Sequence, residues 1–370
     1  MHFLFSAFTL LLFVSLASGQ NRTSVVSPEI DSGDKVTFRL VAPKANDVTI
    51  YGDWMPLGST EKMAKDAGGT WSITLGSIAP GLYIYNFNVD GMAIADPINP
   101  KMKLRARTSA SILELPGKSG ELWEPGDVPH GTIEIINHKS TVINGETRQF
   151  YVYLPPGYEK NKSANYPILY LLHGSNDTPA GWTTMGRANF IMDNLVARKE
   201  AREMIIIMPF GHAVAFGTPG NNNALFEKYL LEEVMPLAEK KYRVAHGREN
   251  RAVVGLSMGG GHSLGIGLGH LDLFSAVGAF SSAVPADFEK RFQGLLNEPE
   301  RTNKKLNLLW IGCGRQDPGF ANSQRLSNLL ITHKIQHTFH PTEGAHTYTV
   351  WRQYFSEVAP LLFQKKTSAK

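Results

Sequence analysis

Residues 252–261 read Ala-Val-Val-Gly-Leu-Ser-Met-Gly-Gly-Gly, an apolar run that leads into Gly-x-Ser-x-Gly and a glycine-rich segment. Ser257 would lie at a sharp turn from a buried strand into a helix, where the residues two before and two after it come too close for side chains. Gly255 and Gly259 occupy those two positions. The helix that begins here would direct free N–H groups and its positive end toward Ser257. We therefore predict that Ser257 is a nucleophile; a glycine-lined packing turn with an inert serine is the alternative.

A serine nucleophile needs a base, and the base needs an orienting carboxylate. After a turn of this kind the three residues follow one another in the order serine, acid, histidine. Asp317 comes after the apolar run 306–311, and His346 comes after the run 336–340. We predict that Asp317 is the acid and His346 the base. The less favoured alternatives are Asp272 and Asp287 for the acid, and His333, His337 and His340 for the base.

The tetrahedral intermediate of acyl transfer needs two N–H donors. The backbone of Met258 is expected to supply one, and the loop after residues 170–173 the other, from either Gly174 or Ser175. We interpret His173 as a structural support of that loop. Side chains in neighbouring loops are candidates for a pocket that takes an aromatic acid: Trp182, Phe210, His212 and Phe216.

From residue 131 onward, apolar runs alternate with longer amphipathic segments such as 190–198 and 226–242, which we expect to be helical. The runs lie at 132–137, 148–154, 167–172, 204–208, 252–255, 276–280, 306–311 and 336–340. Eight strands with helical crossovers predict an α/β fold with a mostly parallel sheet that is covered on both faces. Ligands bind such sheets at the carboxyl ends of the strands.

The preceding part of the chain has short β-type runs separated by turn residues, which predicts an all-β sandwich. These runs are Val36–Val41, Val48–Tyr51, Thr70–Leu75, Leu82–Val89 and Ser111–Leu115. Residues 101–107 place four basic side chains on one face, which we interpret as a solvated edge strand protected by charge. The predicted domains are a sandwich over 20–116, a linker over 117–130 and an α/β domain over 131–370.

Residues 1–19 contain an apolar run followed by Ala-Ser-Gly, which predicts a cleaved signal peptide and a secreted or periplasmic protein. The 370 residues carry a formal charge of +4, which is too small to indicate a nucleic-acid partner. The chain has a single cysteine and no His-Glu-x-x-His, Walker or Gly-x-Gly-x-x-Gly motif. We therefore expect no metal, no cofactor and no membrane partner.

Several motifs of residues 130–365 together resemble carbohydrate esterase family 1, which contains feruloyl and acetylxylan esterases. The motifs are Tyr170–Gly174, Ala180–Leu195, Gly255–Gly260, Trp310–Gly314 with Asp317, and His346–Arg352. The resemblance implies an α/β-hydrolase fold and the same three catalytic residues, Ser257, Asp317 and His346. Related folds occur in siderophore esterases and mycolyltransferases.

The first domain resembles the family-48 carbohydrate-binding modules, which implies an early-set immunoglobulin-like sandwich. The residues that carry this resemblance are Val48–Trp54, Gly69–Trp71, Gly81–Phe87, Val89–Gly91 and Asp96-Pro97. Trp54 and Trp71 either contact a sugar or pack the sandwich. In the second case the domain shapes or shelters the esterase cleft.

The resemblance implies a secreted serine esterase that releases ferulate or p-coumarate from plant arabinoxylan, or from oligosaccharide esters derived from it. The nearest alternative is an acetylxylan esterase, which has the same mechanism and a smaller acyl pocket. A siderophore esterase, an acyltransferase and a catalytically inert glycan-binding protein are further alternatives.

Overall fold

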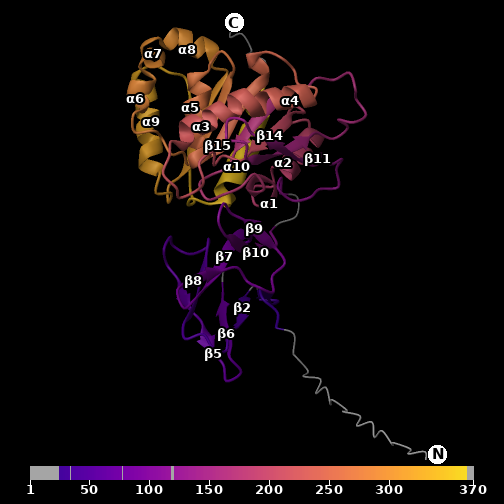
Figure 1. Ribbon diagram of the computed structural model, residues 1–370, viewed down its shortest axis with the longest axis vertical. Helices are drawn as coiled ribbons and strands as arrows, with labels where there is room; N and C mark the ends of the chain where they lie inside the picture. Colours follow the sequence, from indigo (N-terminus) through magenta and orange to yellow (C-terminus); the bar gives the residue numbers. More distant parts are fainter. Residues whose placement is uncertain (1–24, 34, 77, 118–120, 365–370) are drawn as a thin grey trace, which may run out of the picture.

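The computed structural model describes residues 25–33, 35–76, 78–117 and 121–364. The chain forms an all-β region followed by a larger α/β region, and Figure 1 shows the first in indigo below the second. The predicted signal peptide, residues 1–19, lies outside the described residues. No helix within the described residues is long and apolar enough to cross a bilayer.

The α/β region is built on one eight-stranded sheet with the order β11-β12-β14-β13-β15-β16-β17-β18. Its strands are β11 (Thr132–Lys139), β12 (Thr147–Leu154), β13 (Ile168–Leu172), β14 (Ile205–Pro209), β15 (Arg251–Leu256), β16 (Ala276–Phe280), β17 (Leu308–Gly314) and β18 (Thr338–Thr342). β12 pairs antiparallel with β11 and β14, and all other pairs are parallel. The predicted mostly parallel sheet is therefore confirmed.

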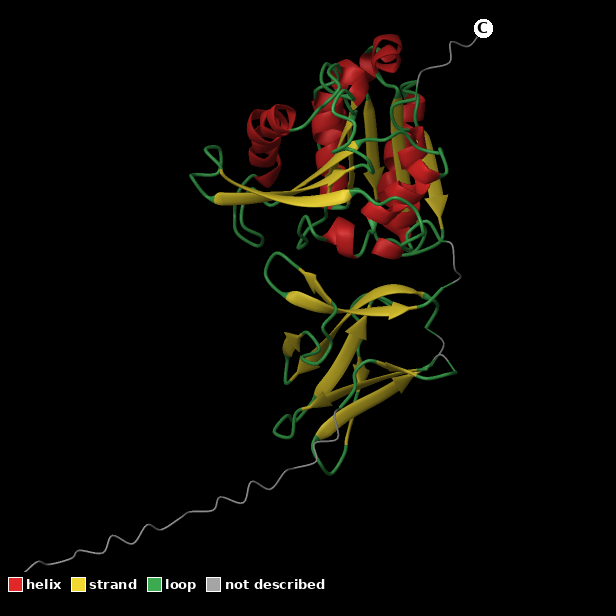
Figure 2. Ribbon diagram, turned by 90° about the vertical axis from the view of Figure 1, so that its right-hand side faces the viewer, coloured by secondary structure: helices red, strands yellow, loops and turns green. Residues whose placement is uncertain are grey.

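Helices cover both faces of this sheet, as Figure 2 shows. The helices are α1 (Gly181–Thr184), α2 (Ala188–Ala197), α3 (Asn222–Tyr229), α4 (Met235–Lys241), α5 (Met258–Gly269), α6 (Phe288–Arg291), α7 (Gln293–Asn297), α8 (Pro299–Lys305), α9 (Phe320–Thr332) and α10 (Tyr348–Val358). A π-helical turn, Leu230–Val234, joins α3 to α4, so the expected helix over 226–242 is continuous but not regular. Short 3-10 turns lie at Arg248–Asn250 and Ala359–Leu361.

The central strand β13 explains why the sheet needs cover on both faces. All five of its residues are buried. Ile168, Tyr170 and Leu172 pack into one apolar cluster, while Leu169 and Leu171 pack into another on the opposite face. Successive side chains of a strand point to opposite faces, so a continuous apolar run serves two cores at once.

The first region consists of two antiparallel sheets that share one apolar core. Its strands are β1 (Glu29–Ile30), β2 (Val36–Val41), β3 (Val48–Gly52), β4 (Glu61–Lys62), β5 (Ala64–Lys65), β6 (Thr70–Leu75), β7 (Gly81–Val89), β8 (Met92–Ile94), β9 (Met102–Leu104) and β10 (Ser109–Leu115). One sheet has the order β1-β2-β6-β5, and the other has the order β4-β3-β7-β10-β9 with β8 beside β7. The expected sandwich is therefore present.

Both tryptophans named in the sequence analysis pack the sandwich. Trp71 is 5% exposed and its indole N–H donates to the Ala42 carbonyl. The Trp54 ring stacks on Phe38, with ring centroids 5.6 Å apart. Of the two alternatives, the geometry therefore favours structural roles for these side chains.

The two regions are joined by a packed interface. Leu82 of β7 and Ile112 of β10 belong to the same buried apolar cluster as Leu169 of the hydrolase sheet. α10 packs against β7, and α1 packs against β9. The sandwich therefore lies against the loops at one edge of the parallel sheet (Figures 1 and 2).

Candidate active site

Ser257 lies between the last residue of β15 and the first residue of α5, with φ 53° and ψ −117°. A positive φ is rare for a residue with a side chain, so this turn is strained. A Cβ on Gly255 would lie 2.3 Å from the Gly259 carbonyl oxygen, and one on Gly259 would lie 2.5 Å from the His173 carbonyl oxygen. Larger residues cannot enter either position without moving backbone. The local geometry is thus that of the predicted nucleophile turn.

Asp317 and His346 meet at the same edge of the sheet. Asp317 follows β17, His346 follows β18, and His346 Nδ1 lies 2.7 Å from Asp317 Oδ2. The Asp317 side chain is fully buried, while 38% of the His346 side chain is exposed. A carboxylate accepts hydrogen bonds, so Nδ1 carries the proton and Nε2 has a free lone pair. The ring is therefore held in the tautomer that a general base requires.

The environment of Asp317 favours its ionised form. Burial acts to raise the pKa of this carboxyl group, but the contacts with His346, together with hydrogen bonds from Ser281 and Gly319, lower it further than burial raises it. The Gly319 N–H also donates to Oδ1, at 2.7 Å. The net result is a pKa below the ordinary value for aspartate.

Ser257 and His346 line one pocket of about 230 Å³. Gly174 and Ser175, the two candidates for the second oxyanion donor, line it as well. A Cβ on Gly174 would lie 3.2 Å from the Ser257 Cβ, so this loop reaches the nucleophile. Met258 is the first residue of α5, where backbone N–H groups have no partner within the helix. Ser257, His346 and both candidates for the second oxyanion donor therefore line one space, and Asp317 reaches it through its hydrogen bond to His346.

Two neutral imidazoles support the loop that carries Gly174 and Ser175. His173 Nε2 accepts a hydrogen bond from the Gly211 N–H at 2.8 Å, and His212 Nε2 accepts one from the Asn176 N–H at 3.1 Å. Burial lowers the pKa of His173, and it lowers the pKa of His212 to about 4. Both rings remain uncharged near neutral pH and can accept these bonds. His173 thus supports the loop, as expected.

The four side chains expected to line an aromatic-acid pocket lie elsewhere. Trp182 is fully buried in α1 and packs against Phe280 and Tyr348. Phe210 and His212 pack with His173 behind the loop, and Phe216 lies against His212. None of the four is among the residues that line the pocket with Ser257, and their role in binding an aromatic acid stays a prediction.

The sandwich contributes part of the pocket wall, which the sequence analysis missed. Asp53, Ile84, Lys103 and Arg105 line the same space as Ser257. Lys103 is 4% exposed, so the expectation of a solvated basic strand was wrong for this residue, whereas Lys101 and Arg107 are exposed and β9 does lie at the edge of its sheet. The alternating basic residues at 101–107 could have indicated this part of the pocket wall, but nothing in the sequence showed which surface of the protein they face.

A buried ion pair fixes this wall. Lys103 Nζ lies 2.7 Å from Asp177 Oδ1, and the two side chains are 5% and 6% exposed. The Tyr348 hydroxyl donates to the other oxygen of Asp177 at 2.8 Å. Paired and hydrogen-bonded charges are the form in which ions are tolerated inside proteins. The contact therefore ties β9 to the loop after the oxyanion residues and to the first residue of α10.

Asp53 is the second carboxyl group of the pocket. Burial raises its pKa to about 6, and the hydrogen bond from the Ile84 N–H and the charges of Arg105 and Lys103 oppose this rise. The Ile84 bond is long, at 3.3 Å. Asp53 therefore changes its charge in a pH range where most aspartates are already ionised.

Within the described ranges, no group of three or more His, Cys, Asp or Glu side chains is placed to hold a metal ion. Cys313, the single cysteine, is buried, and burial raises the pKa of its thiol to about 11. The pocket therefore offers a hydroxyl and an imidazole–carboxylate pair as its reactive groups.

Comparisons with known proteins agree with this geometry. Residues 140–362 match the family model of a putative esterase. The chain is 30% identical over 347 residues to an endo-1,4-beta-xylanase/feruloyl esterase of Xylanibacter ruminicola, which covers 91% of this chain and 46% of that protein. An acetyl esterase of Caldicellulosiruptor saccharolyticus is 24% identical over 225 residues, covering 52% of this chain and 82% of that protein. The chain spans about half the length of the first two curated relatives.

Solved structures give the same result. A ferulic acid esterase of carbohydrate esterase family 1 from Anaeromyces mucronatus matches 67% of this chain and 96% of its own, with 26% identity and a TM-score of 0.58. The enterobactin esterase of Shigella flexneri matches 89% of this chain and 93% of its own, with 19% identity and a TM-score of 0.65, and this likeness shows the fold alone. The chain therefore belongs to the putative esterase family, and it shares its α/β fold with the solved ferulic acid esterase.

Proposed function

We propose that this protein hydrolyses hydroxycinnamoyl esters of arabinoxylan, releasing ferulate or p-coumarate through an acyl-enzyme on Ser257. The observation that carries the proposal is the position of His346. Its Nδ1 is bonded to Asp317 at 2.7 Å, and its ring lines the pocket that also contains Ser257. The curated xylanase/feruloyl esterase relative and the solved ferulic acid esterase support the choice of substrate.

The proposed reaction has two halves. Ser257 Oγ forms a bond to the ester carbonyl carbon while its proton moves to His346 Nε2. The oxyanion is held by the Met258 N–H and by the N–H of Gly174 or Ser175. The bond to the sugar oxygen then breaks, and that oxygen takes the proton from His346. A water molecule next attacks the acyl carbon and loses a proton to His346 Nε2; the bond from that carbon to Oγ then breaks, Oγ takes the proton back from His346, and the acid is released.

Asp317 acts through His346. Its buried carboxylate holds the Nδ1 proton and stabilises the imidazolium that forms in each half-reaction. Its lowered pKa keeps it ionised over the whole range in which the neutral imidazole can act as a base. Asp317 is therefore needed for the orientation and charge of the base and does not itself exchange a proton.

The sharpest test compares the acyl groups. We expect the purified protein to have a higher kcat/KM for methyl ferulate than for methyl acetate, and to release ferulate from arabinoxylan. Hydrolysis of each ester by the Ser257→Ala variant measures the contribution of contaminating esterases. Hydrolysis of acetyl esters with none of methyl ferulate would contradict the proposed acyl group while leaving the serine mechanism intact.

The acetylxylan alternative has one observation in its favour. The pocket around Ser257 measures about 230 Å³, below the roughly 300–1,000 Å³ that is usual for pockets that take drug-sized ligands. An acetyl group needs less room than a feruloyl group. Release of acetate from acetylated xylan at a higher kcat/KM than release of ferulate would select this alternative.

We also propose that the mature protein is exported, because the apolar run and small residues of 1–19 fit a cleaved signal peptide. A plant polysaccharide substrate would be met outside the cytoplasm. The protein recovered from the periplasm or the medium should have an N-terminal sequence that begins near Gln20. An intact Met1 in active exported protein would contradict the proposed cleavage.

A further inference from the structure

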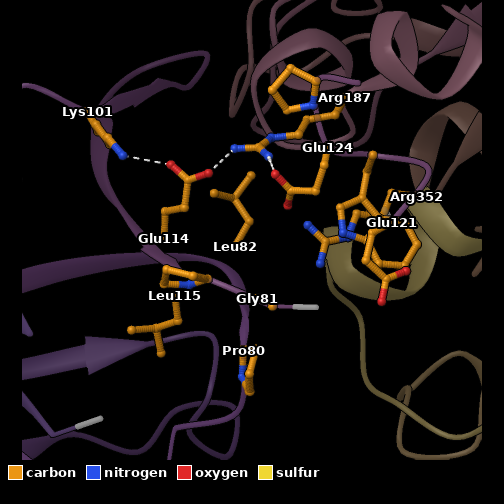
Figure 3. Close-up of a pocket in the computed structure, with 14 residues that line it drawn as sticks. Pro80, Gly81, Leu82, Lys101, Glu114, Leu115, Glu121, Glu124, Arg187 and Arg352 are labelled. Atoms are coloured by element: carbon orange, nitrogen blue, oxygen red, sulfur yellow. Dashed lines mark hydrogen bonds and ion pairs between the residues drawn. The ribbon is translucent and has the colours of Figure 1, made fainter. Parts of the chain in front are cut away.

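A second cavity, of about 770 Å³, lies between the sandwich and the hydrolase region. Its walls come from the first residues of β7, the last residues of β10, the segment 121–125 and the N-terminal end of α2, with Arg352 of α10 (Figure 3). It shares no lining residue with the pocket around Ser257, although Trp351 lines one and Arg352 the other. The cavity is thus a separate space beside the catalytic pocket.

Most charged groups in this cavity are paired with one another. Glu114 accepts from Lys101 at 2.6 Å and also pairs with Arg187. Arg187 pairs in addition with Glu124, at 3.3 Å. Figure 3 shows these contacts as a chain across one wall. Three of the four groups are at least partly buried, and each has an oppositely charged partner.

Arg352 differs from these groups. It is only 5% exposed, yet within the described residues no carboxylate lies at salt-bridge distance from its guanidinium, and its Nε is buried without a hydrogen-bond partner. Its closest contact of note is the Trp123 ring, whose centroid lies 4.6 Å from Cζ. Figure 3 shows the guanidinium pointing into the space bordered by Leu82, Gly81 and Glu121. A buried guanidinium without an anion is costly, because it has lost water and gained no counter-charge.

The electrostatic surroundings of Arg352 add to this cost. Burial and the positive charge of Arg187 lower its pKa, while Glu124 and Glu121 act in the opposite direction. An anion placed in the cavity would therefore be attracted by two guanidinium groups, one of which has no partner of its own. Guanidinium groups bind carboxylates by parallel N–H donors, and an aromatic ring beside them suits the apolar face of a sugar.

We propose that this cavity binds the carboxylate of a hexuronic acid carried by the glycan, with Arg352 as the residue that recognises it. That the ligand carries a carboxylate is inferred from the residues of the cavity alone. The sugar rests on the proposed function, since a glycan ester in the catalytic pocket would place neighbouring substituents of the same chain at the domain interface. Arg352 would then distinguish acidic from neutral glycans without touching the scissile ester.

Glu121 provides the competing explanation. Its carboxylate lines the same cavity beyond salt-bridge distance from Arg352, and a side-chain rotation could make it the permanent partner of that guanidinium. Arg352 would then be structural. In a ligand site, by contrast, Glu121 repels an incoming carboxylate. The Glu121→Gln variant separates the two cases, because it weakens a structural pair but strengthens anion binding.

The test is calorimetric titration of the full chain with xylotriose and with xylotriose that bears a glucuronic acid branch. Neither ligand has an ester bond, so the result does not depend on the serine chemistry. We expect the acidic ligand to bind at least about tenfold more tightly, the ratio typical of a charge-assisted hydrogen bond. The ratio should fall as salt is added. Equal affinities, or no binding of either ligand at millimolar concentration, would overturn the proposal.

Variants locate the effect. Arg352→Gln should reduce the affinity ratio to about one, whereas Arg301→Gln, an arginine on the exposed surface of α8, should leave it unchanged. Glu121→Gln should raise the ratio about two- to threefold, as expected for removal of one nearby like charge. If Arg352→Gln does not fold, the Glu121→Gln result decides. A lower melting temperature with an unchanged ratio in Glu121→Gln would show that Arg352 is a structural partner and would overturn the proposal.

Discussion

Strand β13 of the hydrolase sheet and strand β9 of the sandwich use the same alternation of side chains for different purposes. All five residues of β13 are buried, some in one core and some in the other. In β9, Lys103 is buried in the interface while Met102 and Leu104 are 40% and 56% exposed. A strand that is buried on both faces leaves only its end available for function, whereas an edge strand can present function along one face.

The catalytic groups lie at the ends of strands that are buried on both faces, and part of the pocket wall lies along an edge strand. Ser257, Asp317 and His346 all lie just beyond the ends of parallel strands. Lys103 and Arg105 lie on or next to one face of an edge strand. If this division is real, changes in the hydrolase loops should remove catalysis with little effect on folding, and changes in the sandwich face should alter stability first.

The largest effect is expected for Ser257→Ala. Loss of the nucleophile should lower kcat by about a millionfold, as for other hydrolase triads, with an unchanged melting temperature because the side chain lies in a pocket. Hydrolysis of methyl ferulate and circular dichroism check both parts. Ser356→Ala, at a half-buried serine on α10, is the matched control. Near-normal turnover in Ser257→Ala would contradict the assignment of Ser257, at the end of a buried strand, as the nucleophile.

Asp317→Asn should be the next most damaging change. An amide at this position favours the wrong imidazole tautomer, and we expect kcat to fall about ten-thousandfold, with KM little altered. Asp287→Asn, the alternative acid from the sequence analysis, should keep full activity. Steady-state kinetics of the two variants side by side give the result, and a larger loss in Asp287→Asn would reassign the acid.

In the sandwich, Lys103→Met should act on stability. It leaves the Asp177 carboxylate buried without its cation, and breaking a buried pair in this way costs about 3–5 kcal/mol. The free energy of unfolding from urea titration measures this. The double variant Lys103→Met/Asp177→Asn should recover part of the loss. Lys62→Met, whose side chain is 74% exposed, is the control and should change stability by about 0.5 kcal/mol or less.

The smallest effect concerns Asp53. Its pKa is about 6 in the folded protein against 3.8 for the free side chain, so the folded state holds the proton more tightly than the unfolded state between these pH values. The contribution of Asp53 to the free energy of unfolding must therefore decrease as pH rises from 4 to 6. Asp53→Asn should remove this decrease and stabilise the protein at pH 8 by up to about 3 kcal/mol, with no gain at pH 4.

Urea titrations at the two pH values test this prediction. Asp47→Asn, at an aspartate whose side chain is 53% exposed, serves as the control. A gain of equal size at pH 4 and pH 8 would mean that Asp53 destabilises the fold by its shape and not by its charge.

The parts of the fold that the sequence predicted are those with a strong local cause. The strand at 276–280 has the predicted bounds, because five consecutive small and apolar residues between turns leave little choice. The strand after residue 306 was placed too early: it spans 308–314, since Gly312 and Gly314 continue the pairing with β16 and β18 instead of ending it. The two-residue strands β4 and β5 carry no periodic signal at all.

The same division holds at the candidate site. The positions of Ser257, Asp317 and His346 depend on chain order and on strand ends, and both can be read along the sequence. The pocket wall depends on which surfaces meet, and that is decided by tertiary packing. Trp182 is deep in the core and Lys103 in the interface for this reason. The domain limits at 116 and 130 stay predictions, with β10 ending at Leu115 and β11 beginning at Thr132.

The ion pair of Lys103 and Asp177 also bears on how such proteins diverge. Its two members are 74 positions apart and belong to different regions, and the shared apolar cluster around Leu82 and Leu169 lies at the same interface. A chimera that joined this sandwich to the hydrolase region of another protein would keep Lys103 and Leu82 but lose their partners, Asp177 and Leu169. We therefore expect the coding sequences of the two regions to be exchanged together during evolution. A hybrid should be stable only when its hydrolase region has a carboxylate at the position of Asp177.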